Sequence, residues 1–476
     1  MTPRGGLALV LHTHMPYVEG FGTWPFGEEW LFEAVASVYL PILEVLDGAP
    51  VTVNLTPVLC DQLEALRGEA GDRFLAFLRD IRAPIHEEDA RGLERAGKVE
   101  LAAELRRAAG DYARAEREFE ALGRDLVGAF ARLEGPELWT SAATHAVLPL
   151  LATDAGLRLQ VGTGIAAHER RFGAFGGGFW LPECAYEPGL ERDLSEHRVR
   201  AFCVDQTDAL GLGSPDHLAP VATEAGPVAV PIDWATIRLV WDERAGYPAH
   251  PTYRDYHGRT VHDLKPWSNG GGPYRHAEAV ALAREHARDF VERVARRLEA
   301  RPGGIVTCAL DTELLGHWWY EGIEWLRAVL AEAPARGVRL VTLPQALEEA
   351  ETVERPLAAS TWGTPKDLST WDSPRVAELC FAARRAELRT VAAAATADAR
   401  HPALARAARE LLALQSSDWA FQVTRELAAD YPLRRAREHA ANHDAALAAL
   451  ADSAPVPEPT LRHLAPQLDL ASLLAP

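Results

Sequence analysis

The segment Leu7-Ala-Leu-Val-Leu-His-Thr-His14 decides the fold class of this chain. Its five apolar residues form a short, uninterrupted run, which is typical of a strand buried on both faces of a parallel sheet. Polar residues follow at once, because the run ends in His12-Thr-His14. The segment therefore predicts an α/β fold in which ionisable side chains stand at the carboxyl end of the first strand.

Short apolar runs of the same kind recur along the chain, separated by helix-patterned or irregular segments. They lie at residues 51–55, 138–142, 178–181, 200–204, 228–232, 305–310 and 338–341. Strands that alternate with helices pair in parallel, and a number near seven predicts a closed or nearly closed barrel. Several runs end in ionisable or aromatic residues, as expected when one shared pocket lies at the carboxyl ends of barrel strands.

The remaining segments predict how the chain is divided. Residues 60–132 carry charges at helical spacing around apolar positions, which predicts a mostly helical insertion in a catalytic barrel at 1–353. Residues 240–272 are aromatic and punctuated by Gly and Pro, as in a functional lid loop. From residue 354 the strand pattern ends, and an Ala, Leu and Arg pattern predicts a C-terminal helical domain at 354–476.

The bulk composition limits the partners of the protein. A formal net charge of -19 disfavours nucleic acid and anionic membranes, which would be repelled, and favours a neutral or small ligand. No stretch is apolar for long enough to span a bilayer or to form a signal peptide, so we expect a cytoplasmic protein. We also expect a monomer. The five cysteines lack CxxC spacing, so neither a disulfide framework nor a zinc-cysteine cluster is expected.

Two carboxylates lie in apolar, aromatic surroundings directly after predicted strands. Glu183 occurs in Phe179-Trp-Leu-Pro-Glu-Cys-Ala-Tyr186, and Asp311 in Cys308-Ala-Leu-Asp-Thr-Glu-Leu-Leu-Gly-His-Trp-Trp-Tyr320. Cleavage of a glycoside needs such a pair, one to attack the anomeric carbon and one to deliver a proton. An apolar wall raises the pKa of the acid, which then stays protonated near neutral pH. Either residue alone is equally compatible with a helix cap or an ion pair.

Aromatic residues surround both carboxylates and offer faces for the apolar side of a sugar ring. They are Trp180, Tyr186, Trp318, Trp319 and Tyr320. An aromatic side chain beside a barrel strand is, however, also a common core residue. The aromatic pattern therefore favours a carbohydrate ligand without establishing one.

Four histidines allow a second hypothesis. His12 and His14 form an HxH pair at a strand end, and His145 and His317 follow later. Metal-dependent hydrolases and deacetylases present ligands in this way, with Asp311 or Glu183 as a further ligand or as the base. The same imidazoles can instead form hydrogen bonds with sugar hydroxyls.

Four longer motifs resemble those of the family-57 glycoside hydrolases, most closely their glycogen branching enzymes. They are His12-Thr-His-Met-Pro-Tyr17, Trp139-Thr-Ser-Ala-Ala-Thr-His145, Trp180-Leu-Pro-Glu-Cys-Ala-Tyr186 and Ala309-Leu-Asp-Thr-Glu-Leu-Leu-Gly-His-Trp-Trp319. The resemblance implies a (β/α)7 barrel and a retaining mechanism with Glu183 as nucleophile and Asp311 as acid/base. It also implies α-1,4-glucan substrates such as amylose or glycogen, no metal and no cofactor.

The resemblance also assigns residues that bind the glucan. His14 and His145 would bind the sugar at the cleaved bond, with His12 and His317 alongside. The segment 414–420 resembles one that reaches over the cleft in branching enzymes, which makes Asp418 and Trp419 candidate contacts. Tyr247 resembles the tip of a mobile loop, and Trp362 and Trp371 are candidate acceptor platforms. Trp180, Trp241 and Trp318 complete the expected substrate-binding set.

The expected activity is that of a 1,4-α-glucan branching enzyme, which transfers a cleaved chain to a 6-hydroxyl during glycogen synthesis. The sequence departs from the branching-enzyme pattern after Tyr256 and within 360–371, where an acceptor would bind. An α-glucan hydrolase and a 4-α-glucanotransferase acting through the same site therefore remain alternatives.

Overall fold

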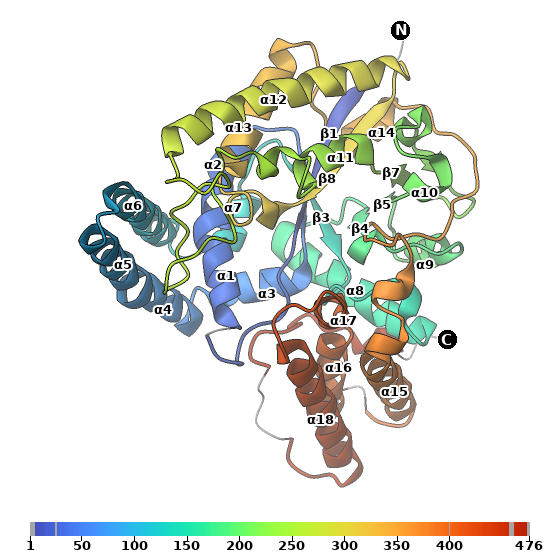
Figure 1. The fold of residues 1–476 in the computed structure, drawn as a ribbon. Coiled ribbons are helices and arrows are strands. Elements are labelled where there is room, and N and C mark those ends of the chain that lie inside the picture. Colours follow the sequence, from blue (N-terminus) through green and yellow to red (C-terminus); the bar gives the residue numbers. More distant parts are fainter. Residues whose placement is uncertain (1–4, 24–25, 399, 457–460, 474–476) are drawn as a thin grey trace.

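A single sheet organises the fold (Figure 1). The computed structural model describes residues 5–23, 26–398, 400–456 and 461–473. The strands are β1 (Gly6–Thr13), β2 (Thr52–Leu55), β3 (Glu137–Ser141), β4 (Gly178–Trp180), β5 (Ala201–Val204), β6 (Val221–Ala222), β7 (Val228–Pro231) and β8 (Ile305–Asp311). Their order in the sheet is β6-β7-β5-β4-β3-β2-β1-β8. All neighbours pair in parallel except β6 and β7, which are antiparallel.

The seven parallel strands close on themselves. Just beyond β7, the backbone N–H of Asp233 donates to the carbonyl of Thr307 on β8 at 2.8 Å. This bond joins the two ends of the parallel series β7-β5-β4-β3-β2-β1-β8. The predicted (β/α)7 barrel is therefore confirmed, with the two-residue strand β6 as an antiparallel addition at its edge.

One of the predicted strands is reduced to a single bridge. Within the described part of the chain, residues 338–341 pair with β1 through a single parallel bridge, between Leu7 and Leu340. The chain then turns into α14 (Leu343–Glu349), because Thr342 caps that helix with its side chain and Gln345 caps in return. A helix that starts directly after the bridge leaves no room for a longer strand.

The strand register places the first functional side chains at one level. All eight residues of β1 are buried, as its uninterrupted apolar run predicted. His12 pairs with Asn54 on β2 and with Asp311 on β8. Because parallel strands end at the same rim of the barrel, these side chains share the carboxyl end with Glu183, which follows β4.

Helices cover the outside of the barrel. They are α1 (Glu28–Ala34), α2 (Leu40–Leu46), α3 (Pro57–Ala65), α7 (Leu126–Ala131), α8 (Asp154–Phe172), α9 (Leu190–Glu196), α10 (Thr207–Leu210), α11 (Trp234–Trp241), α12 (His276–Glu299), α13 (Gly322–Ala335) and α14. Among the residues that the structure describes, no helix is long and apolar enough to cross a membrane. All five cysteines are free thiols, in agreement with their scattered spacing.

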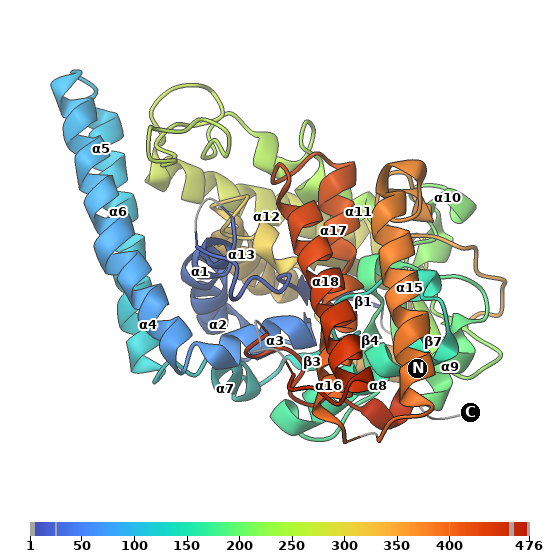
Figure 2. The same cartoon turned by 90° about the horizontal axis from the view of Figure 1, so that it is seen from below.

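A helical hairpin extends beyond the barrel (Figure 2). It follows α4 (Glu69–Ala76) and consists of α5 (Ala83–Arg95) and α6 (Val99–Ala121). Ala90, Ala102 and Leu105 of the hairpin form a small buried cluster with Leu264, which belongs to the segment predicted as a lid loop. The hairpin and this loop thus hold each other in place on one side of the barrel.

A C-terminal helical bundle packs on another side of the barrel (Figure 1). It contains α15 (Ala377–Ala394), α16 (Pro402–Leu414), α17 (Ser417–Thr424) and α18 (Tyr431–Ala451). The Thr144 hydroxyl donates to the carbonyl of Leu412, and the guanidinium of Arg435 donates to the carbonyl of Tyr17. These bonds attach the bundle to the loops that follow β3 and β1. The predicted domain limits themselves stay predictions.

Candidate active site

A single large cavity of about 2060 Å³ opens at the carboxyl ends of the strands. Glu183 and Asp311 both line it, together with His12, His14 and His145. Its walls come from the barrel loops, the α5–α6 hairpin, the segment 241–265 and the bundle helix α17. The carboxylate pair and the histidines that the sequence singled out therefore share one cavity.

Glu183 is held in an unusual backbone conformation at the end of β4. Its φ of 61° and ψ of 18° lie in the left-handed region, which a residue with a side chain adopts only when its surroundings compensate the strain. Its Oε1 accepts a hydrogen bond from the Ser417 hydroxyl at 2.9 Å, and its Oε2 accepts one from the Trp362 indole N–H at 3.2 Å. Burial raises the pKa of Glu183 to about 7, although both hydrogen bonds oppose the shift.

Asp311 is the last residue of β8. Burial raises its pKa well above the ordinary value, and the charges of Glu313 and Glu183 raise it further. A carboxyl group in this state keeps its proton while Glu183 ionises. The two environments therefore separate the pair into a proton donor and an anionic nucleophile, as glycoside cleavage requires.

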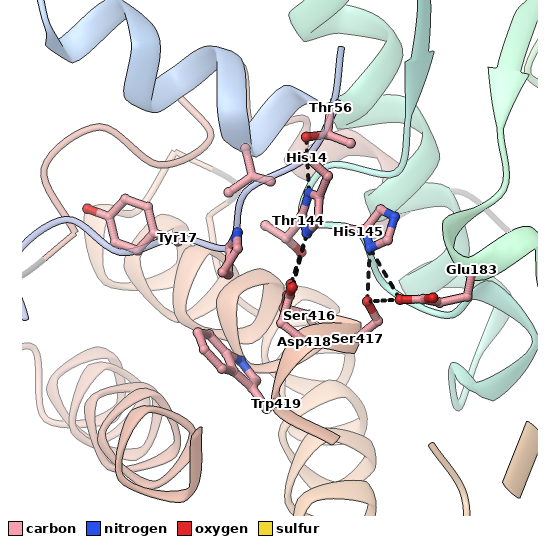
Figure 3. Close-up of polar contacts among 12 residues, drawn as sticks. His14, Tyr17, Thr56, Thr144, His145, Glu183, Ser416, Ser417, Asp418 and Trp419 are labelled. Atoms are coloured by element: carbon pink, nitrogen blue, oxygen red, sulfur yellow. Dashed lines mark hydrogen bonds and ion pairs between the residues drawn. The ribbon is translucent and has the colours of Figure 1, made fainter. Parts of the chain in front are cut away.

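Three histidine rings and one tryptophan form a stack beside Glu183. The ring centroids of His14 and His145 lie 4.0 Å apart, those of His145 and His12 4.9 Å apart, and those of His12 and Trp180 4.7 Å apart. Nδ1 of His12 donates to Oδ1 of Asn54 at 2.7 Å. Nε2 of His14 donates to Asp418 at 3.0 Å (Figure 3). Strand β1 and helix α17 thus position this stack together.

The protonation states differ along the stack. Burial lowers the pKa values of His12 and His145 well below the ordinary value, and the charge of His14 lowers both further. For His14, burial acts in the same direction, but the attraction of Asp418 outweighs it and raises the pKa. His14 is therefore the ring of the three that is most readily protonated, and its two neighbours favour the neutral form.

Hydrogen bonding fixes the tautomer of His145. The Ser417 hydroxyl gives its proton to Glu183, so it accepts from Nδ1 of His145 at 2.9 Å (Figure 3). Nε2 of His145 is consequently the unprotonated nitrogen. It is buried and has no partner among the residues that the structure describes. The ring itself lines the cavity, beside the nucleophile.

The donor atoms of His14, His145 and Asp418 lie within 4.8 Å of one another, as metal ligands would. The two imidazole planes, however, are stacked at 21°, whereas a shared metal lies in the plane of each ring. Asp418 already accepts from His14 and from the Ser416 hydroxyl. The geometry therefore favours a hydrogen-bonded sugar site over the metal hypothesis.

The outer cavity contains the remaining candidates that reach the ligand space. Trp241 and Trp318 are 38% and 44% exposed, and their rings meet edge to face at 6.2 Å. His317 lines the cavity, and burial lowers its pKa to about 4, which keeps the ring neutral. Trp371 also lines the cavity but is almost fully buried.

The structure corrects three predicted glucan contacts. Trp419 is buried within the bundle, where its indole N–H donates to the carbonyl of Ala413 at 2.8 Å. Tyr247 packs against α12 and donates its hydroxyl to Asp289 at 2.6 Å. Trp180 is fully buried behind His12 and supports that ring. In this structure none of the three lines the cavity among the described residues.

The predicted acceptor platform Trp362 lines the cavity and contacts the nucleophile. Its indole N–H and its backbone N–H donate to the Oε2 and the carbonyl of Glu183, respectively. The ring lies edge to face with Trp180 at 5.0 Å. These contacts place Trp362 directly beside the nucleophile, and its use as an acceptor platform stays a prediction.

Sequence reasoning missed two residues that complete the site. Ser417 forms hydrogen bonds with the nucleophile and with His145, and it lies in the segment 414–420 that also contains Asp418. Glu313 is buried and accepts from the Tyr39 hydroxyl at 2.7 Å and from the backbone N–H of His14 at 3.2 Å. Its position two residues after Asp311, at the end of a strand, was the available signal.

The pH dependence of kcat/KM is expected to show the ionisation of the carboxylate pair. Activity should rise with an apparent pKa near 7 as Glu183 ionises, and fall at higher pH as Asp311 loses its proton. Ser417 stabilises the charged form of Glu183, so its removal raises that pKa. Ser417→Ala should therefore move the acidic limb to higher pH, and Ser417→Thr, which keeps the hydroxyl, should restore it. Identical acidic limbs in the wild type and Ser417→Ala would contradict this role.

Comparison with known proteins agrees with the site. Residues 8–357 match glycosyl hydrolase family 57, and residues 381–470 match a C-terminal region described as that of 1,4-alpha-glucan branching enzymes. The chain is 33% identical to the 1,4-alpha-glucan branching enzyme of Thermococcus kodakarensis, over 92% of this chain and 72% of that protein. It is also 33% identical to a probable 1,4-alpha-glucan branching enzyme of Mycobacterium tuberculosis, over 92% and 91% of the two chains.

The three-dimensional likeness covers nearly the whole chain. A crystal structure of a branching enzyme of the same family from Pyrococcus horikoshii superposes with a TM-score of 0.91 at 31% identity. The superposition covers 98% of this chain and 96% of that one. The sequence match to the family extends from the first strand beyond α14, and the chain therefore belongs to glycosyl hydrolase family 57.

Proposed function

We propose that this protein is a 1,4-α-glucan branching enzyme. The observation that carries the proposal is the placement of Glu183 and Asp311 in one cavity, where Glu183 ionises while Asp311 keeps its proton. The match of residues 381–470 to the C-terminal region of branching enzymes supports this activity over simple hydrolysis. Helix α17, which supplies Ser417 and Asp418, lies within that region.

The mechanism follows from the two carboxyl groups. Glu183 attacks C1 of a glucose in the α-1,4-glucan, while Asp311 gives its proton to the leaving oxygen, and a covalent glycosyl-enzyme forms. Asp311 is then the base that removes a proton from the attacking hydroxyl. When that hydroxyl is O6 of another glucan chain, an α-1,6 branch forms and Glu183 is released with its charge restored.

The neutral polar groups of the cavity suit the sugar at the bond to be cleaved. His14 and His145 both line the cavity, so their rings can contact a sugar there. Burial strengthens polar contacts in such a place, since little water competes for the same atoms. His12 and His317, both neutral, would offer further hydrogen-bonding positions.

Amylose is the substrate that tests the proposal. The purified protein would be incubated with amylose in EDTA, and the products would be treated with a debranching enzyme before chain-length profiling and a reducing-end assay. We expect new α-1,6-linked chains with little gain in reducing ends. Reducing ends without branches would instead assign a hydrolase, and longer and shorter linear chains alone would assign a 4-α-glucanotransferase. Loss of activity in EDTA would support the metal-dependent alternative.

We also propose that the enzyme acts as a monomer in the cytoplasm during glycogen synthesis. The five free cysteines support a reducing compartment.

A further inference from the structure

The cavity is larger than one sugar chain at the catalytic carboxylates needs. Its volume of about 2060 Å³ exceeds the roughly 300–1,000 Å³ of ordinary ligand sites. A second part of it lies between helix α6 and the segment 254–265. We call this part the insertion lobe, and it is lined by His86, Leu105, Tyr112, Tyr256, Lys265 and Tyr320. Catalysis by Glu183 and Asp311 does not by itself require this second space.

The insertion lobe is continuous with the acid/base. The chain leaves β8 at Asp311 and runs along the cavity wall through His317 and Trp318 to Tyr320. His317 contacts Tyr256 edge to face at 5.9 Å, and the Tyr320 hydroxyl accepts from Arg107 of α6 at 2.8 Å. The nucleophile lies on the other side, against Trp362 and Ser417. A hydroxyl group that enters from the insertion lobe therefore reaches Asp311, which is the base that must take its proton.

The charges around the insertion lobe are balanced in pairs. Arg82 donates to Glu29 at 3.0 Å and also pairs with Glu33. Arg254 pairs with Glu104 at 2.5 Å, and Arg259 with Asp263 at 2.7 Å. Because these charges are paired, they exert little net electrostatic attraction on an anionic ligand. The lobe is thus polar without strong charge, which suits a neutral chain rich in hydroxyl groups.

Lys265 is the exception to this pairing. Its ammonium lies 3.7 Å from the centre of the Tyr256 ring, and within the described parts of the chain no carboxylate comes within ion-pair distance. The group is half-buried, and burial together with the charge of Arg259 lowers its pKa to about 8. Its N–H groups are therefore poorly solvated donors at the cavity surface. A sugar hydroxyl could accept hydrogen bonds from these N–H groups and so replace the missing water.

We infer that the insertion lobe binds the acceptor glucan chain, with Lys265 donating hydrogen bonds to its hydroxyls and Tyr256 packing beside it. This inference rests on the proposed branching activity, and it assigns the two chains of the reaction to different sides of Asp311. The chain bound at Glu183 lies against α17 and Trp362. The chain that receives it enters between the hairpin and the segment 254–265.

The test separates formation of the glycosyl-enzyme from its transfer. An aryl maltooligosaccharide serves as donor, because its phenol leaving group makes no use of a second glucan site. Phenol release measures the first step, and product analysis with added amylose measures how the intermediate divides between water and O6 of the acceptor. Lys265→Met keeps the length of the side chain and removes the charge and the donors. Lys265→Arg keeps both.

We expect Lys265→Met to release phenol at the wild-type rate but to form branches about tenfold less often relative to hydrolysis, as the loss of a charged hydrogen bond implies. Lys265→Arg should retain most of the wild-type ratio. Lys98→Met is the matched control, because Lys98 is exposed between α5 and α6 and lies outside the cavity. A wild-type ratio in Lys265→Met, or an equal loss in Lys98→Met, would overturn the assignment. If the wild type itself forms no branches, the proposed function fails instead.

Discussion

Replacing Glu183 by glutamine is expected to lower the rate of glucan transfer by at least about 10⁴-fold. The amide cannot attack C1, so no glycosyl-enzyme forms. The fold should persist, because the amide oxygen can still accept from Trp362 and the Ser417 hydroxyl can rotate to accept from the new NH₂ group. Branch formation from amylose measures the effect, and the thermal unfolding transition checks the fold.

Two controls make this result specific to Glu183. Glu224→Gln makes the same chemical change at an exposed position outside the cavity and should leave activity unchanged. In Glu183→Ala, azide should enter the vacated space and restore turnover of an aryl maltooligosaccharide. The product should be a β-glycosyl azide, since attack then occurs once, with inversion. Wild-type transfer by Glu183→Gln would contradict the assignment of the nucleophile.

Replacing Asp311 by asparagine is expected to lower transfer from amylose by about 10²–10⁴-fold, the usual contribution of a general acid. Without a proton from Asp311, the glycosidic oxygen of the departing sugar is a poor leaving group. A dinitrophenyl maltooligosaccharide needs no such proton, so its first step should be nearly as fast as in the wild type. The second step, which also needs Asp311, should stay slow, and the glycosyl-enzyme should accumulate.

Mass spectrometry of the intact protein would detect that intermediate on Glu183. Asp208→Asn is the matched control, because Asp208 is exposed and lies outside the cavity. The basic limb of the pH profile should also disappear in Asp311→Asn, since the group that titrates there is gone. Equal losses with the dinitrophenyl donor and with amylose would show that Asp311 is not the acid.

The parts of the site that follow directly from strands could be predicted from the sequence. His12, His14, Glu183 and Asp311 each stand where an apolar run stops, and parallel strands bring such positions to one rim. The barrel was predictable for the same reason. The shortening of the predicted strand at 338–341 to a single bridge at Leu340 could not be predicted, because it depends on the cap at Thr342 that starts the next helix.

Positions on helices and loops were predicted less well. Asp418 and Trp419 are neighbours on α17, where successive side chains point about 100° apart, and here Asp418 faces the cavity while Trp419 is buried in the bundle. The motif itself does not reveal which of the two faces the cavity. Tyr247 was predicted to contact the glucan because of its position in the loop. Its hydroxyl donates instead to Asp289 on α12, which holds the side chain away from the cavity. Such pairings join residues far apart in the chain, and a single sequence carries no signal for them.

The support of Glu183 by α17 has a consequence for protein synthesis. A ribosome completes both carboxylates at Asp311, yet Ser417 and Asp418 follow only about a hundred residues later. At the usual pace of translation that interval lasts roughly ten seconds. During this time the emerging barrel lacks the hydrogen bonds that orient its nucleophile and His14. The nucleophile and His14 thus gain these hydrogen bonds only when the helical bundle docks on the barrel.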